Sequence, residues 1–172
     1  VDSLEKKRDT SIEREQNLVA LLPGSREREV EALFAPMIGA ALELRQAYPE
    51  LELRFSTAAA NQVLEKRMRE IAAEGGLDDL EFAGEGGVHD LMQRAGAGVV
   101  ASGTATLEAA YFGLPYCLVY RVAWPTYVLG RMLVQVDFLG IVNILAGREV
   151  VRELLQSDAS AAGISAELGR LI

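Results

Sequence analysis

The chain has 172 residues and a net charge of −8, with 50% hydrophobic and 24% charged residues. This length and composition are typical of one globular domain with a hydrophobic core. The negative charge argues against nonspecific nucleic-acid binding, because no basic field is available to displace counterions from phosphates. The single cysteine, Cys117, excludes a disulfide framework and indicates a reducing compartment.

The N-terminal segment, residues 1–16, carries mixed charge and almost no apolar periodicity. We expect it to be a linker or tail, with a folded domain over residues 17–172. Because the sequence begins with Val, we expect a piece of a longer protein. No uninterrupted apolar run reaches the roughly 18 residues of a membrane-spanning helix.

Strands and helices alternate along the rest of the chain. Apolar runs predict strands or extended segments at 18–22, 51–56, 80–83, 98–101, 115–120 and 138–143. Apolar residues at helical spacing predict helices at 27–47, 60–73, 88–94, 104–112, 125–134, 149–156 and 159–171. This alternation predicts an α/β fold, a Rossmann-like three-layer sandwich with a mostly parallel sheet.

Ligands of such sheets bind at the carboxyl ends of the strands, so the strand-to-helix turns are the candidate site. The first turn is Pro23-Gly24-Ser25-Arg26. A glycine turn, a capping serine, helix-start N–H groups and an arginine together favour an anion such as phosphate. The alternative is a simple capped helix in which Arg26 pairs with Glu27 or Glu29. This turn alone does not decide between them.

The second turn is Ser102-Gly103-Thr104, which follows an apolar run and opens a helix. It matches neither the dinucleotide-binding GxGxxG pattern nor a P-loop. Glu108 follows four residues into the helix, where its carboxylate could accept two ribose hydroxyls. Two similar helix starts in one sheet favour an anionic ligand over plain helix capping.

The third turn is Ala146-Gly147-Arg148, with Asn143 before it and Glu149 after it. It offers an amide and a flexible small-residue turn at another expected strand end. A capped helix with surface charges is the alternative.

His89, the only histidine, follows a glycine-rich loop that we expect to line the same cleft. A lone histidine on a short helix is more often a surface residue than a base. No group of residues has metal-ligand spacing, so we expect no metal and no other cofactor. One histidine also gives no convincing Ser/His/Asp triad.

Four segments in this order, "ALLPGSREREV", "ASGTATLEAAYFGLP", "VYR" and "NILAGREVVRELLQ", resemble the C-terminal half of bacterial lipid A disaccharide synthases. The resemblance implies the C-terminal nucleotide-binding domain of a GT-B glycosyltransferase, so that the chain would be a fragment of a longer two-domain protein. Such enzymes transfer 2,3-diacylglucosamine from UDP to 2,3-diacylglucosamine 1-phosphate, with inversion, and form the β-1,6 disaccharide of lipid A.

The resemblance also implies residue roles. Arg26 and Asn143 would be catalytic. The residues implied to bind the UDP-sugar are Gly24, Ser25, Arg26, Ser102, Gly103, Thr104, Ala105, Glu108, Tyr120, Arg121, Asn143, Gly147, Arg148 and Glu149. The chain departs from the family at Ile141-Val142-Asn143, where relatives often have Leu-Pro-Asn.

The partners implied are the UDP-diacylglucosamine donor, the acylated sugar phosphate, an N-terminal domain carrying the base, and a second copy in a homodimer. The implied location is the cytoplasm, with peripheral contact to the inner membrane. Trp124 and Tyr127 favour an acyl or membrane contact, whereas Leu129, Met132 and Leu133 favour an ordinary core helix. The alternatives are another GT-B-like UDP-sugar enzyme, such as UDP-N-acetylglucosamine 2-epimerase or the peptidoglycan precursor glycosyltransferase, and a non-catalytic nucleotide-binding domain.

Overall fold

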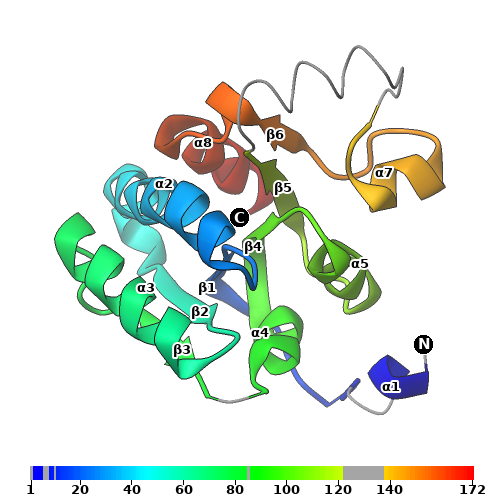
Figure 1. Cartoon of the computed structure of the whole chain (residues 1–172), viewed down its shortest axis with the longest axis horizontal. Helices are drawn as coiled ribbons and strands as arrows, with labels where there is room; N and C mark the ends of the chain where they lie inside the picture. The colour runs from blue at the N-terminus through cyan, green and yellow to red at the C-terminus, as the bar shows by residue number, and fades with distance from the viewer. Residues whose placement is uncertain (1, 6–7, 10, 85, 122–137) are drawn as a thin grey trace.

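A computed structural model of the chain describes residues 2–5, 8–9, 11–84, 86–121 and 138–172 (Figure 1). Its strands form one six-stranded sheet with the order β3-β2-β1-β4-β5-β6, and every neighbouring pair is parallel. The strands are β1 (Glu15–Leu22), β2 (Arg54–Ala58), β3 (Glu81–Ala83), β4 (Ala95–Ala101), β5 (Tyr116–Tyr120) and β6 (Glu153–Leu155). The predicted α/β fold with a parallel sheet is confirmed.

Helices cover both faces of this sheet and give three layers (Figure 1). One face is covered by α2 (Glu27–Ala47), α3 (Gln62–Gly75) and α8 (Ala161–Leu171), and the other by α4 (Val88–Arg94) and α5 (Thr104–Tyr111). The shorter helices are α1 (Asp2–Glu5), η1 (Pro49–Leu51), α7 (Ile141–Ala146) and η2 (Gln156–Asp158).

The apolar run of β1 explains its central place in the sheet. Val19 and Leu21 belong to the core under α2, whereas Leu18, Ala20 and Leu22 belong to the core under α4 and α5. A strand covered on both faces has no reason to alternate polar and apolar residues, so a continuous hydrophobic run is what its sequence requires.

The segment that precedes β1 is in contact with the domain. β1 begins at Glu15, earlier than the predicted strand. Arg14 Nη1 donates to the carbonyls of Ala95 at 2.6 Å and Met92 at 3.2 Å, and Arg14 Nη2 donates to Phe112 at 2.6 Å. These carbonyls lie at the ends of α4 and α5, where a helix lacks internal partners for its last carbonyl groups. Arg14 therefore joins the two helices from a position expected in the linker.

Two predicted elements near the C-terminus are wrong. Residues 138–143 were expected to be extended, but Ile141–Ala146 is helix α7, which ends at Gly147 in a left-handed conformation. Residues 149–156 were expected to be helical, but Glu153–Leu155 is strand β6, followed by η2. The parallel pairing of β6 with β5 supplies backbone hydrogen bonds that local periodicity does not reveal.

The helix predicted at 125–134 lies outside the described residues, as do Trp124, Tyr127, Leu129, Met132 and Leu133. Among the residues that the structure does describe, no helix has both the length and the apolar character needed to cross a bilayer.

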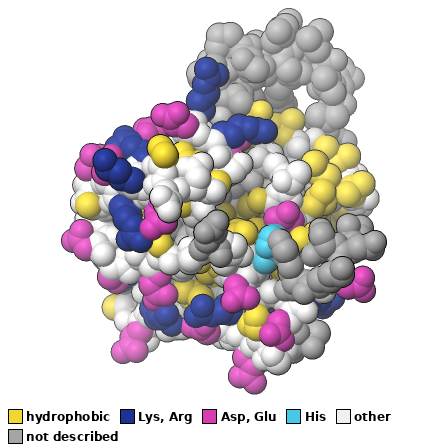
Figure 2. Space-filling view, turned by 60° about the horizontal axis from the view of Figure 1, so that its bottom comes forward, with side chains coloured by type: hydrophobic (Ala, Val, Ile, Leu, Met, Phe, Trp, Pro, Cys, Tyr) yellow, Lys and Arg dark blue, Asp and Glu magenta, His cyan; other side chains and the backbone are white. Residues whose placement is uncertain are grey.

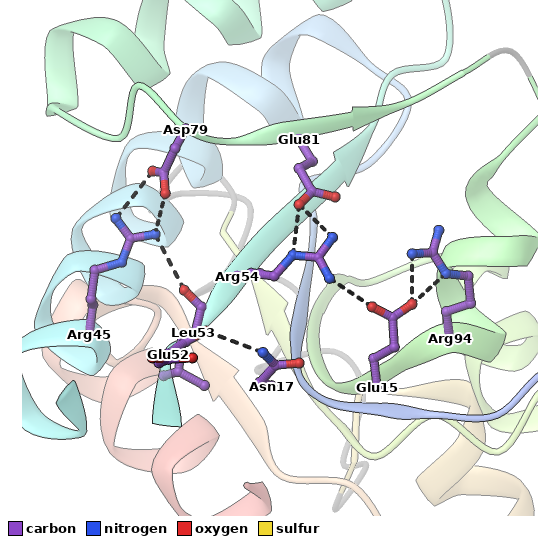
Figure 3. Close-up of polar contacts among 9 residues, drawn as sticks. All are labelled: Glu15, Asn17, Arg45, Glu52, Leu53, Arg54, Asp79, Glu81 and Arg94. Atoms are coloured by element: carbon purple, nitrogen blue, oxygen red, sulfur yellow. Dashed lines mark hydrogen bonds and ion pairs between the residues drawn. The ribbon is translucent and has the colours of Figure 1, made fainter. Parts of the chain in front are cut away.

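A network of ion pairs joins the amino-terminal ends of three strands (Figure 3). Glu15 on β1 pairs with Arg54 on β2 at 2.8 Å and with Arg94 on α4 at 2.6 Å, and Arg54 pairs with Glu81 on β3 at 2.7 Å. Glu15 and Arg54 start their strands, so this network lies at the edge opposite to the strand-to-helix turns of the candidate site.

Candidate functional site

The site lies where the strand order changes direction. β1 is followed in the chain by its neighbour on one side, β2, whereas β4 pairs with β1 on the other side. Leu22 and Val100 are register partners, so the turns that follow β1 and β4 come out side by side. Such a switch point at the carboxyl ends of parallel strands is where open α/β sheets bind their ligands.

These two turns form the rim of a cavity of about 460 Å³. The lining residues come from the ends of β1, β2 and β4, the starts of α2 and α5, and one side of α4 and α7. They are Leu22, Gly24, Ser25, Arg26, Glu29, Ala58, Ala59, Ala60, Val88, Met92, Ala101, Ser102, Gly103, Thr104, Ala105, Glu108 and Ile141. On the face shown in Figure 2, the histidine side chain lies beside an acidic one, and hydrophobic side chains gather nearby.

The lining of the cavity combines polar and apolar residues. The polar part consists of the two turns, which include Arg26, together with Glu29 and Glu108. The apolar part consists of small and aliphatic residues: Leu22, Ala58, Ala59, Ala60, Val88, Met92, Ala101, Ala105 and Ile141. A small-molecule site needs both, because apolar walls bind the body of a ligand and a few polar groups fix its orientation.

The first turn brings its backbone close to Glu29. Gly24 has φ +102°, and a Cβ atom there would lie 2.3 Å from Glu29 Oε2. Only glycine combines that backbone conformation with the space required. Helix α2 begins after Arg26, so Ser25 is not its N-cap residue.

Glu29 bonds this turn through both carboxylate oxygens. Its Oε2 accepts from the backbone N–H groups of Ser25 at 3.2 Å and Arg26 at 3.3 Å, and its Oε1 accepts from Arg26 Nη1 at 2.8 Å. The Arg26 side chain is 80% exposed and that of Glu29 is 26% exposed. The pairing of Arg26 with Glu29, one of the two interpretations of this turn, is therefore present.

The second turn is open toward its surroundings. Gly103 has φ +153°, and, apart from its chain neighbours, no atom of the described residues lies within 4 Å of where its Cβ would be. Thr106 donates its hydroxyl to the Gly103 carbonyl at 2.6 Å, which fixes the start of α5. The Ser102 N–H donates to the Val119 carbonyl at 2.9 Å and ties the turn to β5. The backbone at Gly103 thus leaves room for a ligand to approach.

Glu108 lies one turn into α5 and faces the cavity from beside this loop. His89 on α4 lies behind it, with Nε2 3.4 Å from Glu108 Oε2 and a side chain that is only 14% exposed. The expectation that His89 is a surface residue is wrong. Val88 and Met92 from the same helix line the cavity directly.

The third turn lies apart from this group. Asn143 is buried, and its amide is bonded within its own segment: Nδ2 donates to the Val151 carbonyl at 2.7 Å and to Glu153 Oε1 at 2.8 Å. Its Oδ1 accepts from the N–H groups of Val150 at 2.8 Å and Val151 at 3.0 Å. An amide has two donor hydrogens and two acceptor lone pairs, so these contacts use its full capacity.

Other residues expected around the nucleotide also have contacts elsewhere. Arg121 donates to the carbonyls of Ala32 at 3.1 Å, Gln156 at 3.3 Å and Ala159 at 2.8 Å, which joins the end of β5 to α2 and to the segment before α8. Tyr120 packs partly buried beside α5, and Gly147, Arg148 and Glu149 are exposed. None of these residues is among the described residues that line the cavity.

Sequence reasoning placed neither Glu29 at the cavity nor His89 beside Glu108. Glu29 had a signal, because an acidic residue three positions after a helix N-cap commonly bonds the cap backbone. His89 had a weaker signal, because it follows the glycine-rich loop that was expected to line the cleft. Across the described ranges, no group of three or more His, Cys, Asp or Glu side chains is arranged to hold a metal ion.

Comparison with known proteins places these features in a family. The family model described as lipid-A-disaccharide synthetase matches residues 2–172. The chain is 40% identical over 157 residues to a lipid-A-disaccharide synthase of Geobacter sulfurreducens, covering 91% of this chain and 40% of that protein. It is 40% identical over 150 residues to a lipid-A-disaccharide synthase of Syntrophus aciditrophicus, covering 87% of this chain and 38% of that protein. The chain thus spans about 40% of the length of these relatives.

Among solved structures, the pneumococcal O-GlcNAc transferase GtfA in complex with UDP and GlcNAc superimposes with a TM-score of 0.48 and 15% identity. The superposition covers 94% of this chain and 29% of that one. This likeness is too distant to bear on function.

Proposed function

Because the chain belongs to the lipid-A-disaccharide synthetase family, we propose that residues 17–172 are the UDP-sugar-binding domain of a lipid A disaccharide synthase. The whole protein would transfer 2,3-diacylglucosamine from UDP to 2,3-diacylglucosamine 1-phosphate and form the β-1,6 disaccharide. The observation that supports this most is the cavity at the switch point, where two glycine turns, Arg26 and Glu108 meet.

In this proposal the diphosphate lies between the starts of α2 and α5. Helix N-termini carry N–H groups and a positive dipole end, and Arg26 adds a guanidinium suited to phosphate. When the sugar is transferred, negative charge develops on the departing UDP. Donors that are already in place stabilise such charge without reorganisation, which lowers the barrier.

The nucleoside would then lie deeper in the cavity. Glu108, which lines the cavity, would accept hydrogen bonds from the ribose hydroxyls, and the base would lie near the small side chains of residues 58–60. The high exposure of Arg26 lets it turn between Glu29 and a ligand. Asn143 would act indirectly, because its bonds fix α7, which places Ile141 at the cavity.

The rest of the proposal concerns partners. An N-terminal domain would supply the base and much of the acceptor site across a cleft, and two copies would form a homodimer. The whole protein would act on the cytoplasmic side of the inner membrane. Because its proposed substrates are acylated, it would contact that membrane peripherally.

Calorimetric titration of the chain with UDP, with UMP and ADP as comparison ligands, tests the nucleotide site. We expect selective binding of UDP that Arg26→Ala and Glu108→Ala each weaken about tenfold to a hundredfold, the range for losing a charge-assisted hydrogen bond. Arg28→Ala is the matched control, because Arg28 is exposed on the same helix and does not line the cavity. If a folded chain binds no UDP, or if Arg28→Ala weakens binding as much as Arg26→Ala, the proposed site is wrong.

A further inference from the structure

The carboxylate of Glu29 uses the donors that a diphosphate would need. It accepts from the backbone N–H groups of Ser25 and Arg26 and pairs with the Arg26 guanidinium. These are the donors of the first turn to which the proposed function assigns the diphosphate. The Glu29 carboxylate and a bound diphosphate would therefore need the same donors.

Charge and space both prevent a second anion from using these donors while the Glu29 side chain stays in place. A phosphate oxygen within hydrogen-bond distance of the Ser25 and Arg26 N–H groups would lie close to Glu29 Oε2, which already accepts from both. Two anionic oxygens at that separation repel each other strongly. Space is also limited at Gly24. The Glu29 carboxylate fills the volume beside this residue where a Cβ would be, so a ligand anion cannot occupy the same volume. The turn holds either the Glu29 carboxylate or the ligand anion.

The Glu29 side chain is able to leave. It lies in the first turn of α2 and is 26% exposed, and its arginine partner is 80% exposed. Contacts between such exposed charges are weak, so rotation of the carboxylate into solvent has a modest cost. The same rotation would free the Arg26 guanidinium for the incoming anion.

We propose that Glu29 is an internal competitor for the diphosphate, and so a residue that sets the affinity and selectivity of the site. This inference rests on the proposed function. The carboxylate occupies the anion position, and a diphosphate binds only as Glu29 swings out. A ligand without phosphate has no such barrier, so Glu29 lowers the affinity for UDP and leaves that for uridine unchanged. After transfer, the returning carboxylate promotes release of UDP.

The proposal is tested by removing the charge and keeping the shape. Glu29→Gln keeps an oxygen that can bond the Ser25 and Arg26 N–H groups, which preserves the helix start. Glu27→Gln is the matched control, because Glu27 lies in the same first turn and carries the same charge without bonding the loop. Binding of UDP, inorganic pyrophosphate and uridine is measured calorimetrically for the wild-type chain and each variant, with circular dichroism to verify folding.

We expect Glu29→Gln to tighten binding of UDP and pyrophosphate about three- to tenfold, because the apparent Kd rises as the competent fraction falls. The affinity for uridine should stay unchanged, and Glu27→Gln should have less than half the effect. Glu29→Asp is a second variant: it keeps the charge but withdraws the carboxylate from the turn, so it should also tighten UDP binding.

Two outcomes would contradict the proposals, and they can be told apart. If Glu29→Gln and Glu29→Asp weaken UDP binding or leave it unchanged, Glu29 supports the loop and is not a competitor, and this proposal is overturned while the proposed function stands. If the wild-type chain and both variants bind neither UDP nor pyrophosphate, the anion site itself is wrong and both proposals fail.

Discussion

His89 Nε2 lies 3.4 Å from Glu108 Oε2, and the pair connects α4 to α5 beside the cavity that Glu108 lines. The imidazole also packs against the ring of Phe112, with ring centroids 5.5 Å apart and an angle of 57° between the planes. The imidazole thus contacts both an aromatic ring and a carboxylate. Glu108 has a neighbour that can hold its orientation toward the cavity.

The first prediction follows from this pair. If Glu108 accepts the ribose hydroxyls, Glu108→Gln should weaken UDP binding about tenfold and leave the affinity for inorganic pyrophosphate unchanged, because pyrophosphate has no ribose. Titration of the same variant with 2′-deoxy-UDP should show a smaller loss. Equal losses for UDP and pyrophosphate would mean that Glu108 acts on the diphosphate or on the loop.

The second prediction concerns His89 itself. His89→Ala should weaken UDP binding a few-fold, since Glu108 loses the polar neighbour whose Nε2 lies 3.4 Å from its carboxylate, and His89→Gln should restore much of the loss by providing a donor. The comparison is made calorimetrically, with pyrophosphate as the ligand that should not change. A loss that His89→Gln does not restore would assign His89 a packing role against Phe112 alone.

The third prediction separates a structural role of Asn143 from a catalytic one. Asn143→Ala removes four hydrogen bonds and leaves the N–H groups of Val150 and Val151 without their acceptor. We expect it to lower the free energy of unfolding by about 2–4 kcal/mol in urea denaturation. Asn17→Ala is the control, because half-buried Asn17 makes a long, solvent-exposed bond to the Glu52 carbonyl at 3.3 Å. An unchanged urea midpoint for Asn143→Ala would favour a ligand role.

The fourth prediction concerns Cys117. Burial raises the pKa of this thiol to about 12, so little thiolate exists near neutral pH in the folded chain. The thiol should therefore react with Ellman's reagent at pH 8 only as fast as the chain opens, and at once in urea. A fast stoichiometric reaction under native conditions would show that the core around β5 opens readily.

The sequence was sufficient for the elements whose pattern is local. The run at 18–22 had to be a buried strand, and the helix at 27–47 has a continuous apolar face from Val30 to Leu44, ending before Pro49 as expected. Chain alternation then predicted the parallel sheet. The helix predicted at 149–156 was wrong because this segment contains β6, a strand of three residues at the edge of the sheet. Its identity depends on pairing with β5, which its own periodicity cannot reveal.

The same distinction applies to the site. The turns after β1 and β4 could be predicted to meet, because carboxyl ends of neighbouring parallel strands lie at one edge. Gly24, Arg26, Gly103 and Glu108 indeed line one cavity. The orientation of side chains could not be predicted. The Asn143 amide turns inward to its own segment, because burying an amide requires that all its polar groups find partners.

The last prediction concerns acid stability and the network of Figure 3. Hydrogen bonding to Arg94, with further contributions from Arg54, lowers the pKa of Glu15 in the folded chain below its usual value. A carboxyl group whose pKa is lower in the folded state stabilises the fold above its unfolded pKa of about 4.3, and this contribution is lost as the pH falls through the folded value. We therefore expect the urea midpoint to fall as the pH is lowered from about 5 to 3.

Glu15→Gln tests whether this network causes the loss. The variant should be less stable than the wild type at pH 7, and the difference should shrink as the pH falls through the lowered pKa of folded Glu15, because protonation removes the ion pairs with Arg54 and Arg94. Glu43→Gln, on the exposed side of α2, should leave the pH dependence of the wild type unchanged. If the difference between Glu15→Gln and the wild type is the same at pH 7 and pH 3, the network contributes through packing of β1 against β2 and α4, and its charges do not control acid stability.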